Sequence, residues 1–294
     1  MNPIESKPVF SHVRRDEWVL RSFGEPLSHM KEFERKGPFS ISEIRKSKGR
    51  KVLCFADLAS LIAELGYQNH QYNLLFRGQD DDYKDKNGKT KAYPSIFRTP
   101  KNHFTKNIAK NRFEAIDKAI GALSKAREQL GLHSVLKNYR EYYMALIQHY
   151  ELFKTPMLDL TQSLLVAASF ALQKNRTGYL YVFGMPHPHG SISHFIDDSL
   201  VLVKLQNVCP PEALRPHFQE GYLVGRLPST KTKEAGDNIA RRLIGKYFLD
   251  NTNRTFWKDG FKQIPRNVLY PTNDKFLLKL KTILNKALDN KIQP

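Results

Sequence analysis

Hydrophobic residues recur at helical spacing in several parts of the chain. In the stretch 57–65, leucine or isoleucine occupies positions 58, 61, 62 and 65, and this i, i+3, i+4, i+7 pattern places the four side chains on one face of a helix. Segment 164–172 is almost entirely apolar, so it predicts a short helix that is buried on every side. Amphipathic patterns predict further helices at 104–130, 138–150, 238–249 and 276–288.

Shorter apolar runs between these helices predict strands. Residues 74–76 form one continuous apolar run, and residues 179–183 form a second, which follows a glycine. Another strand is expected at 200–205, and 215–223 is typical of a turn that leads into a strand. The segment 155–163 is predicted to be a turn that leads into the apolar helix.

The order of these elements indicates an α+β fold with one central, mostly antiparallel sheet and a helical wall. Strands and helices alternate irregularly, and the sequence contains no GxGxxG fingerprint and no P-loop. Doubly wound nucleotide-binding folds therefore have no support. The sequence also lacks a GxSxG nucleophile elbow and an HExxH zinc motif.

Composition divides the chain into two parts. Residues 1–50 are polar and basic, with prolines at positions 3, 8, 26 and 38, and we interpret them as an N-terminal appendage. Residues 51–294 form the main domain in this interpretation. The whole chain of 294 residues is 40% hydrophobic, which is enough apolar mass for a substantial core.

The cellular compartment is inferred from what the sequence carries. Cys54 and Cys209 cannot supply a disulfide framework by themselves, so they suggest a reducing compartment. No apolar segment of the secretory type follows Met1, and the most apolar stretch, 163–172, is too short to span a bilayer. We expect a cytoplasmic protein with no membrane partner.

The net charge points to an anionic partner. The formal charge is +18, from 47 Lys and Arg against 29 Asp and Glu, and such a field attracts polyanions, most commonly nucleic acid. The 13 tyrosines and 18 phenylalanines offer surfaces on which bases can stack. The alternative is a charge that only keeps the protein in solution, since the basic residues are spread over the chain.

Two polar stretches raise the question of a metal site. Residues 80–82 are three successive aspartates, but they lack the alternation and the closing glutamate of a calcium loop. Three histidines, at positions 187, 189 and 194, fit no standard zinc spacing. We expect no metal at either stretch.

An arginine and a glycine end the strand predicted at 74–76. Arg77 carries a planar fork of five donors, which suits a phosphate or a carboxylate. Gly78 lacks a Cβ, so a ligand or another backbone can approach it closely. The alternative for Arg77 is a structural ion pair with an internal carboxylate.

Two titratable residues near the centre of the chain have open roles. His149 ends a predicted helix, and it is either a general base or a core histidine held by a hydrogen bond. Asp159 precedes the apolar helix, so it is either a capping carboxylate or a catalytic one. Thr161 or Ser163 is expected to cap that helix.

Several segments of the chain, in order, resemble the FRG domain family, which is named for the Phe-Arg-Gly of its first strand. The first is Leu-Phe-Arg-Gly-Gln at 75–79, and the second is Tyr-Pro-Ser-Ile-Phe-Arg at 93–98. The resemblance covers residues 50–285. Its remaining segments are Gln-His-Tyr at 148–150, Leu-Asp-Leu-Thr at 158–161, Ser-Phe-Ala at 169–171, Arg215 with Gln-x-Gly-Tyr at 219–222, and 267–271.

The chain departs from the central family block, His-Tyr-Gly-Leu-Pro-Thr-Arg-Leu-Leu-Asp-Trp-Thr. Glu151 replaces its glycine, Pro156 its arginine and Leu160 its tryptophan, and one extra residue lies between Tyr150 and Asp159. Loss of the arginine removes a phosphate-type contact, so the resemblance implies an activity that differs from the family or is weaker.

The family layout is similar, more distantly, to that of ADP-ribosyltransferases, and this implies an NAD site. Arg77 would bind the NAD diphosphate, Thr161 or Ser163 would shape the nicotinamide pocket, and Glu220 would support positive charge on the ribose. His149 completes the candidate catalytic set. The residues expected to bind the cofactor are Phe76, Arg77, Gly78, Gln79, Ser95, Arg98, Tyr150, Asp159, Thr161, Ser163 and Gln219.

Two functions remain open from the sequence. The first is an NAD-using, ADP-ribosyltransferase-like effector that modifies a nucleic acid or a protein. The resemblance implies bacterial or phage defence or toxin biology, with a partner protein in such a system. The second is a non-catalytic, basic nucleic-acid-binding module, for which the +18 charge is the main support.

Overall fold

The computed structural model describes residues 19–20, 39–99, 104–132, 134–227 and 233–287. Most of the predicted appendage at 1–50 therefore lies outside the described residues. Within it, β1 (Val19–Leu20) and β2 (Phe39–Ser40) pair with each other in a separate two-stranded sheet. No helix among the described ranges is long and apolar enough to cross a bilayer.

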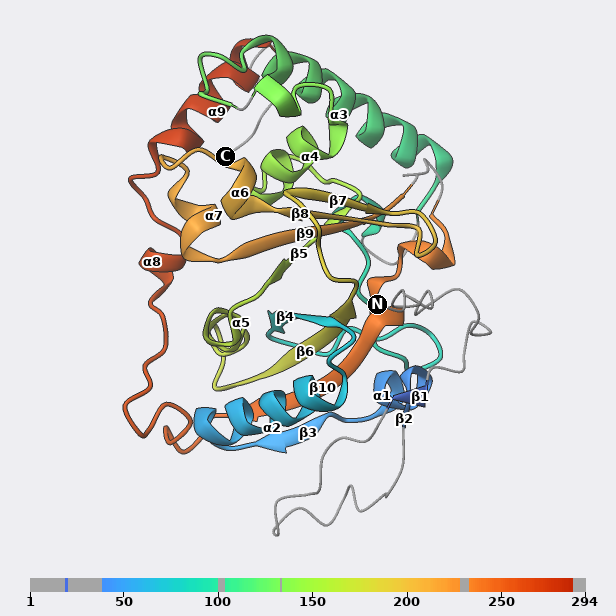
Figure 1. The fold of residues 1–294 in the computed structure, drawn as a ribbon, viewed down its shortest axis with the longest axis vertical. Helices are drawn as coiled ribbons and strands as arrows, with labels where there is room; N and C mark the ends of the chain where they lie inside the picture. Colours follow the sequence, from blue (N-terminus) through green and yellow to red (C-terminus); the bar gives the residue numbers. More distant parts are fainter. Residues whose placement is uncertain (1–18, 21–38, 100–103, 133, 228–232, 288–294) are drawn as a thin grey trace, which may run out of the picture.

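An eight-stranded sheet forms the centre of the described residues (Figure 1). All neighbouring strands are antiparallel except β3 and β10, so the predicted α+β fold with a mostly antiparallel sheet is confirmed. In spatial order the strands are β3 (Arg50–Val52), β10 (Leu243–Asp250), β6 (Thr177–Met185), β4 (Asn73–Gln79), β5 (Met157–Thr161), β9 (Gly221–Arg226), β8 (Leu200–Lys204) and β7 (Ile192–Phe195).

The sheet is joined at its middle by very little backbone pairing. Strands β4 and β5 share one register pair, Phe76 with Thr161, whereas β4 pairs with β6 over the whole of 73–79. The two halves diverge from this junction, with β3, β10, β6 and β4 below and β5, β9, β8 and β7 above in Figure 1. The ends of β4 and β5 beyond the junction are therefore free to line a cavity.

Helices cover the outer faces of the two halves (Figure 1). The upper half is covered by α3 (Lys106–Lys125), α4 (Arg140–His149) and α9 (Lys275–Ala287), and α1 (Ile41–Lys46) and α2 (Phe55–Gln68) pack against the lower half. The helices predicted at 57–65, 104–130, 138–150 and 276–288 correspond to four of these. The short helices are α6 (Leu205–Val208), α7 (Leu214–Phe218) and α8 (Arg266–Leu269), and 3₁₀ turns lie at Ser95–Phe97, Ser134–Leu136, Ala235–Asp237 and Ile239–Arg242.

Strand β5 belongs to two hydrophobic cores. Leu158 and Leu160 point into the core that the lower half shares with α2, while Met157 points into the core under α3 and α4. Alternate side chains leave opposite faces of a strand, so Asp159 lies on the same face as Met157, toward α4. This explains how a carboxylate comes to lie inside the protein.

Helix α5 (Leu164–Ala171) lies against the junction of the two halves, on β4 and β6. Its approach is very close, because a Cβ on Gly78 would lie 1.9 Å from the carbonyl oxygen of Ala167 and one on Gly178 would lie 2.1 Å from that of Ala171. Only glycine fits beneath this helix. Ser163 caps the helix by accepting a hydrogen bond from the backbone of Val166.

Two of the predicted elements are wrong. The segment 238–249 is a 3₁₀ turn followed by strand β10, not a helix, and Lys246 is fully buried within that strand. The segment 155–163 contains strand β5, so Asp159 lies within a strand and does not cap a helix. Both strands have neighbours on each side in the sheet and are buried on both faces, which removes the alternation by which a strand is recognised.

Candidate functional site

A cavity of about 190 Å³ lies at the junction of the two half-sheets. Arg77 comes from β4, Asp159 from β5, and Arg215 from α7. The remaining lining residues are Phe76, Gly78, Glu151, Leu160, Thr161, Phe170, Gln219 and Tyr270. Two cations and two carboxylates thus line one small cavity, with Glu151 at its exposed side.

Arg77 enters the cavity with part of its guanidinium unpaired. Its Nη1 donates to the carbonyl oxygen of Asp159 at 2.5 Å. Its Nε is buried and has no acceptor among the described residues. Burial lowers the pKa of Arg77, although the nearby Asp159 carboxylate opposes this shift.

Arg215 forms the opposite cationic wall. Its Nη2 donates to Glu151 Oε1 at 2.6 Å, and its guanidinium lies over the ring of Tyr270, 4.4 Å from the centroid. Its Nε is also buried without an acceptor among the described residues. Two arginines that line the cavity thus each carry a buried N–H group without a partner among the described residues, and such groups are rare in folded proteins.

Asp159 supplies a fixed negative charge beside these arginines. Its Oδ2 accepts from Gln148 Nε2 at 2.7 Å, and its Oδ1 lies 3.4 Å from His149 Nδ1. Burial would raise the pKa of this carboxyl, but the contact with His149, the charge of Arg77 and the Gln148 amide outweigh burial and lower it. About a third of the side chain (35%) stays accessible, so an ionised carboxylate faces the cavity.

His149 lies behind Asp159 and is only 2% exposed. Burial lowers its pKa, which keeps the imidazole neutral near pH 7. The ring does not line the cavity. His149 therefore lies in the core, but neither ring nitrogen has a hydrogen-bond partner among the described residues, and Nδ1 only faces Asp159 Oδ1.

Gln148 connects two of the sequence segments that resemble family motifs. Its Oε1 accepts from Ser95 Oγ at 2.9 Å and from Thr155 Oγ1 at 2.7 Å, while its amide holds Asp159. Ser95 thus supports the site from behind and does not line it. Tyr150 is also remote, since its hydroxyl donates to Asp274 at 2.9 Å.

The later candidates divide between the cavity and its surroundings. Thr161 lines the cavity, but its hydroxyl donates to the Gln219 carbonyl oxygen at 2.7 Å. The Gln219 amide donates to the carbonyl of Leu269 at 2.7 Å, which fixes the segment before Tyr270. Glu220 does not line the cavity, and its carboxylate accepts from Gln162 at 3.3 Å.

Gln79 and Arg98 line a second cavity, of about 350 Å³, and not the first. Arg98 Nε donates to the Tyr93 carbonyl at 2.7 Å. Desolvation and the charge of Arg77 lower the pKa of Arg98 to about 10, although the side chain keeps contact with solvent. The two cavities are neighbours, because Gly78 lines the first and Gln79, the next residue of β4, lines the second.

Six residues of the site were not among the sequence candidates, two of them the apolar Leu160 and Phe170. Gln148 had a signal, because it opens the Gln-His-Tyr segment. Arg215 lay in a recognised motif but received no role. The sequence did not indicate a role for Glu151 or Tyr270. Glu151 reaches the cavity through a tight backbone turn (φ 57°), and Tyr270 belongs to a segment far away in the sequence.

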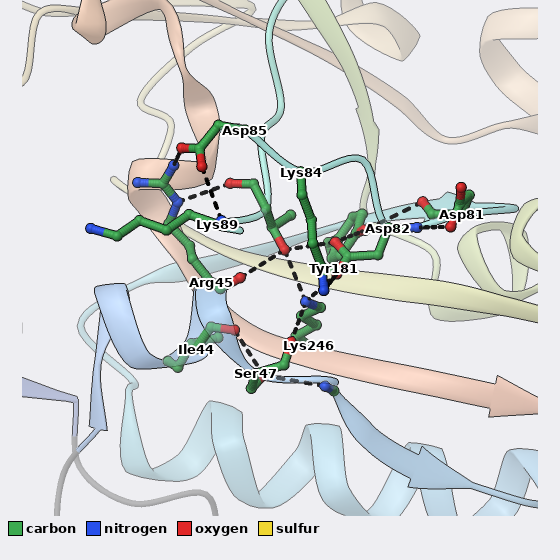
Figure 2. Close-up of polar contacts among 12 residues, drawn as sticks. Ile44, Arg45, Ser47, Asp81, Asp82, Lys84, Asp85, Lys89, Tyr181 and Lys246 are labelled. Atoms are coloured by element: carbon green, nitrogen blue, oxygen red, sulfur yellow. Dashed lines mark hydrogen bonds and ion pairs between the residues drawn. The ribbon is translucent and has the colours of Figure 1, made fainter. Parts of the chain in front are cut away.

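The aspartate run at 80–82 contributes to a buried polar cluster, which we call the Lys246 cluster (Figure 2). Lys246 Nζ donates to Asp82 Oδ2 and the Ser47 carbonyl, both at 2.6 Å, and to Thr90 Oγ1 at 2.9 Å. Asp82 also accepts from Tyr181 at 3.0 Å. Within the described ranges no group of three or more His, Cys, Asp or Glu side chains could hold a metal ion.

Comparison with known proteins places the site in a family context. Residues 72–179 match the family model described as the FRG domain, so the chain contains an FRG domain. The match includes Arg77, Gln148 and Asp159, whereas Arg215 and Tyr270 lie beyond it. No curated protein matches the chain, and no solved structure does.

Proposed function

We propose that the cavity at the sheet junction binds the diphosphate of a nucleotide, with NAD as the candidate, and that the FRG domain acts as an ADP-ribosyltransferase-like enzyme. The supporting observation is that Arg77 and Arg215 both line this cavity and that each has a buried Nε without an acceptor among the described residues. An arginine fork matches phosphate oxygens in shape and charge. A diphosphate would supply the missing acceptors to both walls.

The carboxylates of the cavity fit the same ligand. NAD supplies an ADP-ribosyl group: the ribose–nicotinamide bond breaks, its electron pair leaves with nicotinamide, and an acceptor nucleophile forms the new bond and loses its proton. The ionised Asp159 would stabilise positive charge on the ribose. In this proposal Asp159 takes the role expected of Glu220, because Asp159 and Glu151 are the acidic residues among those that line the cavity.

The test is nicotinamide release from NAD by the purified full chain, together with NAD binding by calorimetry. We expect Arg77→Ala to weaken NAD binding by at least about tenfold, because one charge-assisted contact is lost. Arg140→Ala is the matched control, since Arg140 pairs with Asp117 on the helical wall. Absence of binding at about 1 mM NAD, or equal binding by the two variants, would overturn the proposal.

The net charge of +18 supports a second candidate, a non-catalytic module that binds nucleic acid. This function would need no NAD. It would give tight binding at low salt that weakens steeply as salt rises. A place in bacterial or phage defence or toxin systems is supported for either function by the family resemblance alone.

A further inference from the structure

The second cavity, of about 350 Å³, differs in chemistry from the first. Its lining contains three cations, Lys91, Arg98 and Lys233, and no carboxylate. The cavity at the junction, by contrast, balances two arginines with Glu151 and Asp159. The net positive charge of this lining favours an anionic occupant.

Aromatic rings form the other part of this lining. Tyr83 is 46% exposed and so presents an open ring surface. Tyr93 lies under a cation, with Lys233 Nζ 4.2 Å from its ring centroid. Phe97, which is buried, closes the base of the cavity. Rings interleaved with cations are the combination that holds a base and its phosphate.

Two polar groups in the same lining are unsatisfied. Gln79 Oε1 and Thr99 Oγ1 are buried and have no hydrogen-bond partner among the described residues. Native proteins seldom leave such atoms without a partner. Both residues line the cavity, so a rotation of each side chain would turn its unpaired group toward the polar edge of a base or a sugar hydroxyl.

The two cavities open from the same strand. Gln79 follows Arg77 by two positions on β4, so the two side chains leave the same face of the strand. Arg98 feels the charges of both Arg77 and Asp159. A molecule in the second cavity would therefore lie next to one in the first.

We propose that the second cavity is a subsite for one nucleotide of a single-stranded nucleic acid. The base stacks on Tyr83, its polar edge meets Gln79 and Thr99, and the phosphate binds Arg98 and Lys233, whose ammonium lies over Tyr93. This inference rests on the proposed function in one respect: it makes the nucleic acid the acceptor for a group transferred from the first cavity. The binding itself does not require NAD.

The test is fluorescence anisotropy of the full chain with a labelled single strand of about 12 nucleotides, titrated at several salt concentrations. The double variant Arg98→Ala, Lys233→Ala should weaken binding at least about tenfold and reduce the salt slope by about 1.4, as expected for two lost phosphate contacts on a single strand. Lys275→Ala, Lys279→Ala removes the same charge from exposed positions of α9. This control should keep the wild-type slope.

A second pair of variants tests stacking without a change of charge. Tyr83→Ala should weaken binding about fivefold to a hundredfold, because a stacked base loses its platform. Tyr67→Ala is the control, since Tyr67 is 84% exposed and lies on α2, outside this lining. Equal losses within either pair of variants, or no binding at low salt, would overturn the subsite.

The outcome is separable from that of the proposed function. Strand binding that depends on Arg98 and Tyr83, without nicotinamide release, would retain the subsite and remove the transferase. Nicotinamide release that depends on Arg77, with strand binding unchanged in the Arg98 and Tyr83 variants, would do the reverse.

Discussion

The Lys246 cluster and the junction cavity both place positive charge inside the protein, but they satisfy it differently. Lys246 is completely buried, and its ammonium donates to three oxygen acceptors, one of them the Asp82 carboxylate. Arg77 and Arg215 are also held within the protein, yet each keeps a buried Nε without an acceptor among the described residues.

The difference distinguishes a structural charge from one kept for a ligand. A buried ion pair is tolerated when its hydrogen bonds are complete, and the Lys246 cluster meets that condition (Figure 2). The alternative interpretation of Arg77 as a structural ion pair describes Lys246 much better. Arg77 instead donates to the carbonyl oxygen of Asp159 and leaves one donor for something else.

The largest effect should come from breaking the saturated cluster. Asp82→Ala leaves the Lys246 ammonium buried without its counter-charge, and we expect a loss of about 3–5 kcal/mol in the free energy of unfolding. Asp81→Ala, at the exposed neighbouring position, should change it by no more than about 0.5 kcal/mol. Urea denaturation followed by circular dichroism measures both. Losses of similar size would contradict a structural role for the cluster.

Replacing each buried cation by methionine should separate a structural charge from one kept for a ligand. Lys246→Met should cost about 3–5 kcal/mol, because it strands Asp82. Arg77→Met removes a charge that is only partly satisfied, so its cost should stay below about 1.5 kcal/mol. Denaturant titration of the pair measures this contrast. An Arg77→Met variant as unstable as Lys246→Met would make Arg77 structural.

Acid should lower the free energy of unfolding, first through protonation of His149 and then through protonation of Asp159. The folded-state pKa of His149 is lowered from 6.5 by burial, and that of Asp159 is lowered from 3.8 by its partners against the effect of burial. Both contributions are complete above about pH 6.5 and are lost as pH falls. The free energy of unfolding should therefore decrease from pH 6.5 downward.

A variant without the imidazole isolates its share of this decrease. His149→Gln should flatten the dependence between pH 6.5 and 4, because no group at that position then titrates. The decrease at lower pH should remain, since Asp159 is still present. Denaturant titrations of both proteins across this range give the comparison. Parallel curves would rule out a contribution from His149.

The smallest effect should be a gain. Glu151 has φ 57°. Its side chain is 63% exposed, and its carboxylate accepts a hydrogen bond from Arg215 Nη2. Glu151→Gly relieves left-handed backbone but loses a weak ion pair, so we expect about 0.5 kcal/mol of added stability. It should also tighten NAD binding, because a competing carboxylate is removed.

Asp259→Gly is the matched control for the backbone effect. Asp259 has φ 61° and is exposed, and it does not line either cavity. It should gain stability without a change in NAD affinity, as measured by calorimetry. Equal affinity in the two variants would show that Glu151 does not compete with the ligand.

The sequence predicted the fold class and most of the helices, but the two central strands were misjudged. Hydrophobic periodicity is reliable where one face meets water, as on α2 and α9. Strands β5 and β10 are buried on both faces, so their apolar residues do not alternate with polar ones. Lys246 added to the error, because a lysine in such a run is normally read as a solvent-exposed position.

Site residues were predicted from the sequence only where a single segment contained several residues with a recognisable binding or catalytic role. Arg77, Asp159 and Gln219 were candidates, and all three line the junction cavity. Arg215 and Tyr270 enter from elements far away in the sequence, and local patterns contain no information about such contacts. The unpaired Nε groups of Arg77 and Arg215 can be identified only in the structure, where the acceptors around each group are known.

The close fit of α5 on Gly78 affects how genetic data on this domain should be interpreted. Any side chain at position 78 would clash with the backbone of Ala167. A substitution there should therefore reduce the amount of folded protein, whether or not it changes ligand binding. In a screen scored by activity, Gly78 and Arg77 variants would look alike although one loses abundance and the other affinity. The glycine of the Phe-Arg-Gly motif is required because α5 packs directly against it. Replacements of this glycine should be tolerated only together with compensating changes in α5.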